Sequence, residues 1–276
     1  MVCKDVLAVI ESAYPAEYAL EWDNVGLLAG RDDGEVKSIY IAVDATDEVI
    51  REAVCRSADL LITHHPLIFG GMKRITNRDF IGRRLLELIH HDISCYAMHT
   101  NYDVLRMAKL SADMMRLEGQ EVLEVTCRGM EAAKTREGAG NSEGTESSVE
   151  GIGRIGQFER PVTLRQCCEE VKKAFRLDGV RAFGDLEGQV ERIAICPGSG
   201  KSVIQEALRK KADVLISGDI GHHEGIDAAA QGMAVIDAGH YGIEWIFVED
   251  MERYLAENLS GVEIMTASLR HPFASV

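Results

Sequence analysis

Two stretches of the chain share the same order of apolar and polar positions. Residues 38–65 and 192–219 align without a gap at an offset of 154, with ten identical positions out of 28. Each begins with a β-branched apolar run, passes through a turn into apolar positions at helical spacing, and ends in a second β-branched run. This order predicts a βαβ unit with parallel strands in each half. Any two βαβ units share this periodicity, but the identities favour a duplication.

A shorter similarity extends the repeat. Residues 93–103 align with 234–244 at an offset of 141, which places a histidine over a histidine and an acid over an acid. The two halves therefore continue alike beyond the βαβ unit. We predict an α/β protein of two related lobes with parallel or mixed sheets.

The segment 134–150 separates these lobes. It is rich in Gly, Ser, Thr and Glu and almost free of apolar residues, which is typical of a linker or mobile loop. The first α/β lobe is then 1–133 and the second 151–276, although the C-terminal segment could pack back on the first lobe. Within the second lobe we predict amphipathic helices over 161–175, which opens with a capping-box spacing, and over 243–257.

The composition excludes several classes of protein. Thirty basic and 45 acidic residues give a net charge of −15, which repels nucleic acid. No apolar run approaches the roughly 20 residues that a membrane span needs, and the N-terminus does not resemble a signal peptide. The seven cysteines include no C-x-x-C pair, so neither a zinc ribbon nor a disulfide framework is expected. We expect a cytoplasmic protein with no membrane or nucleic-acid partner.

Histidines cluster where apolar strands end. Six of the nine follow four such runs, and sites in parallel α/β sheets form beyond the carboxyl ends of strands. A histidine pair alone is more often structural or at the surface than a pair of ligands. The four groups are His64 with His65, His99 with Asp103, His222 with His223, and His240 with Glu244.

The spacing of His240 and Glu244 adds to this signal. On a helix, positions i and i+4 share one face, so both side chains can point to one ligand. A surface His–Glu pair has the same spacing, but the matching pair His99 and Asp103 in the other half favours ligation. Imidazole and carboxylate together suit zinc, iron or manganese. PGSGKS at 197–202 lacks the first glycine of a P-loop and is interpreted as a strand-to-helix turn.

Several motifs together resemble one family. EWDNVGLLAG, ITHHPLIF, HTNYD, GRIG, SGDIGHHEGIDA and GHYGIEW occur in this order through nearly the whole chain. They resemble the signatures of the Nif-three-like family, also catalogued as GTP cyclohydrolase I type 2 homologues. The resemblance implies two α/β lobes, a dinuclear metal site in the cleft between them, and a ring-shaped homo-oligomer, commonly a hexamer. The metal ligands it implies are His64, His65, Asp103, His240 and Glu244.

We therefore expect a hydrolase in which two divalent ions, of zinc, iron or manganese, activate a bridging water. Glu244, which the resemblance makes a bridging ligand, is also a candidate catalytic residue, together with His99 and His223 as proton carriers or substrate contacts. A small anionic or nucleotide-like substrate fits this chemistry, and its phosphate contacts could include Lys73, Arg74 and Arg78, although each could equally be a solvated loop charge. The alternative is a non-catalytic metal-binding adaptor or metallochaperone that acts through protein–protein interaction.

Overall fold

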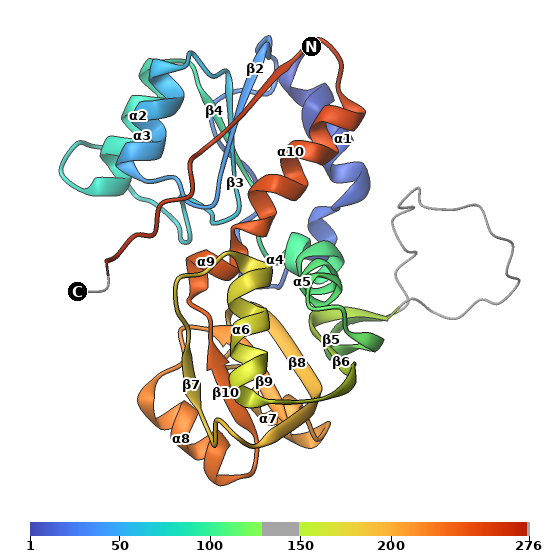
Figure 1. Ribbon diagram of the computed structural model, residues 1–276. Coiled ribbons are helices and arrows are strands. Elements are labelled where there is room, and N and C mark those ends of the chain that lie inside the picture. Colours follow the sequence, from blue (N-terminus) through green and yellow to red (C-terminus); the bar gives the residue numbers. More distant parts are fainter. Residues whose placement is uncertain (129–148, 275–276) are drawn as a thin grey trace, which may run out of the picture. The chain divides into compact units, whose positions relative to one another are not determined.

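The computed structural model describes residues 1–128 and 149–274, which fall into two compact units (Figure 1). Both units combine helices with a β-sheet, which confirms a mixed α/β fold with two sheets. The predicted linker lies outside the described residues except for its last two positions, and the predicted lobe boundaries stay predictions. Within the described ranges, unit 1 comprises 1–102 and 247–269, and unit 2 comprises 103–128, 149–246 and 270–274.

Unit 1 is built on a five-stranded sheet with strand order β1-β4-β3-β2-β11. Strand β1 runs antiparallel to β4, and the other neighbours are parallel. The elements are α1 (Cys3–Ala13), η1 (Ala16–Tyr18), β1 (Gly26–Ala29), β2 (Ser38–Ala42), α2 (Asp47–Cys55), β3 (Leu60–Thr63), α3 (Phe80–His90), β4 (Ser94–Ala97), α4 (Thr100–Tyr102), α10 (Ile246–Asn258, from Phe247 on) and β11 (Glu263–Thr266).

Helices cover both faces of this sheet. Helices α2 and α3 lie on one face and α1 and α10 on the other (Figure 1). The Tyr254 hydroxyl of α10 donates a hydrogen bond to the Val9 carbonyl of α1 at 2.9 Å. Every residue of β2, β3 and β4 is buried, because both faces are covered. This explains why these strands are continuous apolar runs in the sequence rather than alternating ones.

Unit 2 has a six-stranded sheet in the order β5-β6-β8-β9-β10-β7. Strands β8, β9 and β10 are parallel, and the outer strands are antiparallel to their neighbours. The elements are the π-helix η2 (Asp103–Met107), α5 (Ala108–Met114), β5 (Glu118–Arg128), β6 (Val149–Thr163), α6 (Leu164–Phe175), β7 (Arg181–Phe183), β8 (Gln189–Ser199), α7 (Ile204–Arg209), β9 (Val214–Gly218), α8 (His222–Ala230), β10 (Ala234–Asp237) and α9 (His240–Glu244).

Of the two helices predicted in this region, one is confirmed and the other is divided into two elements. Helix α6 begins with the predicted capping box, in which Thr163 and Gln166 each accept the other's backbone N–H. The helix predicted over 243–257 is wrong as a single element. It is interrupted at Trp245, which separates α9 from α10. The interruption coincides with the passage of the chain from one unit to the other.

The longer repeat of the sequence has the same strand pairing in both units. Ile39 of β2 pairs with Leu60 of β3, and Ile193 of β8 pairs with Val214 of β9, each partner 154 positions on. The carboxylate of Asp59 accepts two backbone N–H groups at the start of β2, and Asp213 accepts two at the start of β8. The shared Ala-Asp dipeptide before each inner strand therefore has a structural role in both units.

The shorter similarity, between residues 93–103 and 234–244, differs by one residue from the pairing of the strands. Leu60 pairs with Ser94, and Val214 pairs with Ala234, so the equivalent strands are offset by 140 rather than 141. The additional residue of unit 2 lies between the end of β10 and His240. Gly239 stands there with φ 76°, a conformation that suits glycine.

In the described ranges 1–128 and 149–274, no helix combines the length and the apolar character that crossing a bilayer requires.

Candidate metal centre

Three imidazoles of unit 1 lie together at one edge of its sheet. His64 and His65 directly follow β3, and His99 follows the neighbouring parallel strand β4. Parallel neighbours end at the same edge, which brings the three rings together. Each residue offers one ring nitrogen, and these nitrogens lie within 4.8 Å of one another. The three could hold a metal ion.

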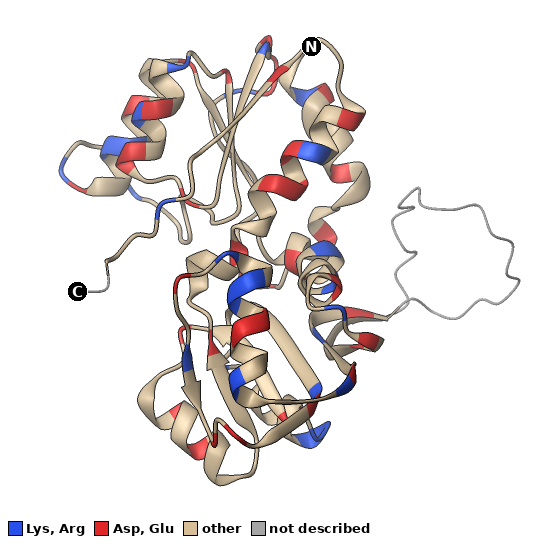
Figure 2. Cartoon of the chain, in the orientation of Figure 1, with Lys and Arg blue, Asp and Glu red and all other residues tan. Residues whose placement is uncertain are grey.

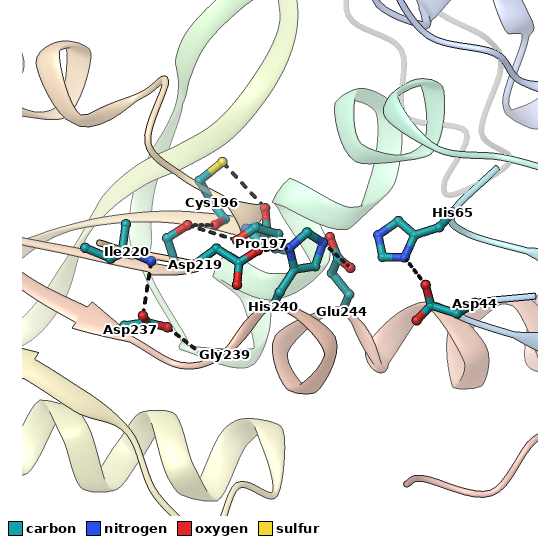
Figure 3. Close-up of polar contacts among 12 residues, drawn as sticks. Asp44, His65, Cys196, Pro197, Asp219, Ile220, Asp237, Gly239, His240 and Glu244 are labelled. Carbon is teal, nitrogen blue, oxygen red and sulfur yellow. Dashed lines mark hydrogen bonds and ion pairs between the residues drawn. The ribbon is translucent and has the colours of Figure 1, made fainter. Parts of the chain in front are cut away.

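The hydrogen bonds of His64 and His65 define which nitrogen is available to a metal. His64 Nδ1 lies 2.9 Å from the Met98 carbonyl oxygen. His65 Nδ1 lies 2.8 Å from Asp44 Oδ1, as Figure 3 shows. Both partners are acceptors, so Nδ1 carries the proton in each ring. In neutral imidazole the other nitrogen, Nε2, then keeps its lone pair and can act as ligand.

His99 is oriented by a buried carboxylate. Its Nδ1 donates to Asp23 Oδ1 at 2.9 Å, and Asp23 also accepts the backbone N–H and the hydroxyl of Thr100 and the backbone N–H of Asn24. The Asp23 side chain has no exposed surface. Burial alone would raise the pKa of Asp23, but the hydrogen bonds from His99 and Thr100 outweigh it and lower that pKa to about 2.

Unit 2 presents a histidine and a carboxylate on one helix turn. His240 Nε2 lies 3.1 Å from Glu244 Oε2, which confirms that the i, i+4 spacing places both side chains on one face of α9. Asp219, directly after β9, accepts a hydrogen bond from His240 Nδ1 at 2.8 Å (Figure 3). Glu244 is only 2% exposed. His240 thus repeats the arrangement of the histidines of unit 1. Its Nδ1 donates to an acceptor, and its Nε2 lies next to Glu244.

The end of β8 approaches Glu244 closely. Gly198 has φ 75°, and a Cβ atom at this position would lie 2.4 Å from Glu244 Oε1. Glycine at position 198, in the P-loop-like PGSGKS segment, therefore allows the close approach of Glu244. Acidic side chains also surround the Cys196 thiol. Burial raises the pKa of this thiol above its usual range, and the negative charges of Asp103 and Glu244 raise it further. Asp103 thus belongs to the same neighbourhood of unit 2.

Asp103 opens the π-helix η2 (Asp103–Met107). π-Helical turns are rare, and they occur frequently at functional sites. The predicted catalytic residue His223 lies exposed at the start of α8, with its ring 5.2 Å from that of His222. In the ranges that the structure describes, no hydrogen bond or ion pair links His223 to His240 or Glu244. Its predicted catalytic role stays a prediction.

The sequence interpretation missed the carboxylates that orient the histidines, Asp23, Asp44 and Asp219. Two of them had a signal: Asp44 and Asp219 each follow a buried parallel strand, as the histidines do. Asp23 had none beyond its place in EWDNVGLLAG, because it lies 76 positions from His99 in the chain.

Comparison with known proteins identifies the chain. The model of the Duf34/NIF3 (NGG1p interacting factor 3) family matches residues 1–272. The chain belongs to this family. A curated relative from Clostridium acetobutylicum, named GTP cyclohydrolase 1 type 2 homolog, is 31% identical over 96% of this chain and 94% of its own length. A relative of the same name from Streptococcus pneumoniae is 33% identical over 93% of this chain and 91% of its own.

Solved structures agree with the family assignment. The Bacillus cereus protein related to NIF3 has a TM-score of 0.87 and 25% identity, over 100% of this chain and 99% of that one. The NIF3-family fold is therefore established for this chain.

Proposed function

We propose that this NIF3-family chain is a hydrolase that depends on two divalent metal ions. The proposed ligands are His64 and His65 of unit 1 with Asp103, His240 and Glu244 of unit 2. The observation that carries the proposal is the orientation of the imidazoles within each unit. The acceptors on Nδ1 leave Nε2 as the ligand atom, which is the arrangement typical of metal-binding histidines.

The residues present fit divalent metal ions. Neutral imidazole nitrogen and carboxylate oxygen are common ligands of zinc, iron and manganese, and a carboxylate can bridge two ions. Glu244 suits the bridging role because its side chain is buried beside His240, where a cation would compensate its charge. His99 lies within the His64–His65 group and is available as a further ligand or as a substrate contact.

When bound, the two ions would supply Lewis acidity and lower the pKa of a coordinated water to about 7. The chain's own residues would orient the substrate and move protons. His99 is a candidate proton carrier at Nε2, because its Nδ1 is held by the hydrogen bond to Asp23. We assign His223 and Glu244 as further candidates for proton transfer: His223 is exposed and can exchange protons with water.

The proposal includes a small anionic or nucleotide-like substrate and assembly into a homo-oligomer, with a hexamer expected. The net charge of −15 argues against nucleic acid as the substrate. Sedimentation velocity of the purified protein would measure the oligomer size.

Metal analysis of single variants tests the proposal. We expect the wild-type protein to retain two ions per chain, and His64→Ala and His240→Ala each to lower metal affinity at least about tenfold, because each removes a ligand. Hydrolysis of a panel of nucleotides and other phosphate esters would be assayed on the same preparations. His90→Ala, which removes an exposed histidine of α3, is the matched control.

Unchanged metal content in both ligand variants would refute the ligand assignment. Full metal content without any turnover across the panel would instead favour the metal-binding adaptor over the hydrolase.

A further inference from the structure

A pocket opens beside His99 in unit 1. It has a volume of ≈ 650 Å³ and is lined by two segments of the chain. One is the turn at Asp23 and Asn24, and the other is the loop 68–75 that leads from β3 towards α3. The Asn24 side chain donates to the Ile68 carbonyl at 2.6 Å and joins the two segments. The volume falls within the roughly 300–1,000 Å³ typical of pockets for small organic ligands.

The loop side of the pocket is positively charged. Lys73 and Arg74 both line it, and the segment 66–78 contains three basic residues and no acid, in a chain with 15 more acids than bases. Figure 2 shows this loop with basic positions before α3. Among the described residues, neither Lys73 nor Arg74 has an ion pair. The one carboxylate of the lining, Asp23, has no exposed side-chain surface, so it presents its main chain to the pocket.

The backbone of the loop is open beside these basic side chains. In the described part of the chain, the amides of Gly70, Gly71 and Met72 form no hydrogen bond with another residue. A Cβ atom on either glycine would meet nothing within 4 Å, and neither has a positive φ, so packing does not require glycine there. Both glycines are exposed, so the backbone beside Lys73 and Arg74 is open to solvent and to a ligand.

An aromatic surface adjoins the charged loop. Phe69 lines the pocket, is 57% exposed, and has its ring centre 6.0 Å from that of His99. Trp22 is 62% exposed and packs edge-on against the same imidazole at 5.8 Å. Large exposed aromatic rings beside a pocket are suited to stacking against a flat ligand.

We propose that this pocket binds a phosphorylated molecule with a flat aromatic ring, such as a nucleoside monophosphate, with the phosphate at Lys73 and Arg74 and the ring on Phe69. Binding here does not require metal. The pocket adjoins the His99 edge of the proposed metal centre, so the inference names a substrate class for that centre and to this extent rests on the proposed function.

Binding to metal-free protein tests the proposal. Isothermal titration calorimetry would use the four ribonucleoside 5′-monophosphates, the corresponding nucleosides, and inorganic phosphate. At least one monophosphate should bind more tightly than its nucleoside and than phosphate. Lys73→Ala/Arg74→Ala should weaken that binding at least about tenfold, because charged hydrogen bonds to the phosphate are lost, and added salt should weaken wild-type binding.

The ring contact is tested separately. Phe69→Ala should weaken binding of the monophosphate about tenfold but leave binding of phosphate alone unchanged, because stacking acts only on the ring. Phe69→Tyr keeps the ring and should bind like wild type. Arg160→Ala/Lys173→Ala removes two exposed basic residues of unit 2 and is the matched control, which should leave binding unchanged.

The outcomes separate this inference from the proposed function. Metal-independent binding that the Lys73/Arg74 variant loses, while it keeps its metal content, supports the pocket whatever the ligand variants show. No binding by any monophosphate, or equal binding by the double variant and wild type, overturns the pocket and leaves the metal centre standing. Metal loss in His64→Ala with nucleotide binding retained is also consistent with the pocket.

Discussion

The two units use the same scaffold to present different ligand atoms. In unit 1 the sheet edge carries three imidazoles, His64, His65 and His99, and so offers nitrogen. In unit 2 the corresponding region offers one imidazole, His240, together with the carboxylate of Glu244. The strand pairing that positions them is equivalent at an offset of 154. The ends of the strands thus determine where ligand residues can lie. The amino acid at each of these positions determines whether it offers a nitrogen or an oxygen atom.

The carboxylates that orient the imidazoles show this most clearly. In unit 1, Asp44 after β2 orients His65 after β3. In unit 2, Asp219 occupies the position equivalent to His65 and orients His240 after the next strand. The same strand end therefore carries a ligand in one unit and its hydrogen-bond partner in the other. A simple doubling of one ligand set does not describe the site.

The three carboxylates that orient the histidines differ most in how deeply their side chains are buried. Asp23→Ala should therefore lower the free energy of unfolding more than any other variant below. Asp23 has no exposed side-chain surface and accepts four hydrogen bonds, whereas the side chains of Asp44 and Asp219 are 40% and 58% exposed. Loss of this buried charged network should lower the free energy of unfolding by about 3 kcal/mol. Urea unfolding of the metal-free protein measures it, with Asp44→Ala and Asp219→Ala each expected within about 1 kcal/mol of wild type.

The effect of Asp23→Ala should also depend on pH. The folded pKa of about 2 lies below the ordinary value of 3.8, so the ionised form stabilises the folded state above about pH 4. This contribution is lost as the pH falls through about 2. The difference between wild type and variant should therefore narrow in acid, and a constant difference from pH 6 to pH 2.5 would contradict the account. Equal destabilisation by Asp219→Ala would remove the contrast between the units.

Gly198→Ala should have the next largest effect and should act on unit 2 alone. The substitution adds a side chain at φ 75° and places Cβ 2.4 Å from Glu244 Oε1. We expect about 2 kcal/mol of destabilisation and weaker metal binding, because Glu244 must move. Urea unfolding and metal analysis measure the two effects. The equivalent residue of unit 1 is Asp44, whose φ is not positive, so the constraint has no counterpart there.

Gly179→Ala is the control for this prediction. Gly179 is exposed, has no positive φ, and a Cβ there would meet nothing within 4 Å. Its replacement should leave stability and metal binding unchanged. Wild-type metal affinity in Gly198→Ala would show that Glu244 is not held in place by this contact.

The features that could be predicted from the sequence depend on the spacing of residues along the chain. The βαβ units follow from apolar periodicity, the start of α6 from the Thr163–Gln166 spacing, and the His240–Glu244 pair from helical geometry. Each involves residues close together in the chain or a repeated pattern, so the interactions follow from spacing.

The remainder depends on tertiary contacts that spacing does not define. Asp23 and His99 are brought together by the pairing of β1 with β4, and the two sides of the pocket are joined by the hydrogen bond from Asn24 to the Ile68 carbonyl. The interruption at Trp245 likewise has no periodic signal, because apolar positions continue at helical spacing across it. Sequence therefore indicated several candidate ligands but not the groups that orient them.

The smallest predicted effect tests whether the scaffolds are equivalent. Asp59 and Asp213 each accept two backbone N–H groups through one carboxylate oxygen, and Asp59 also accepts the Ser38 hydroxyl at 3.1 Å. Asp59→Asn and Asp213→Asn keep the shape and an acceptor oxygen but remove the charge. Each should lower the free energy of unfolding by about 1 kcal/mol, the difference between charged and neutral hydrogen bonds. Metal binding should be unchanged in both, because these carboxylates lie at the opposite ends of the strands from the ligands. Urea unfolding and metal analysis of the two variants side by side would decide the matter: a large loss in one and none in the other would mean that the repeated dipeptide has a structural role in only one unit.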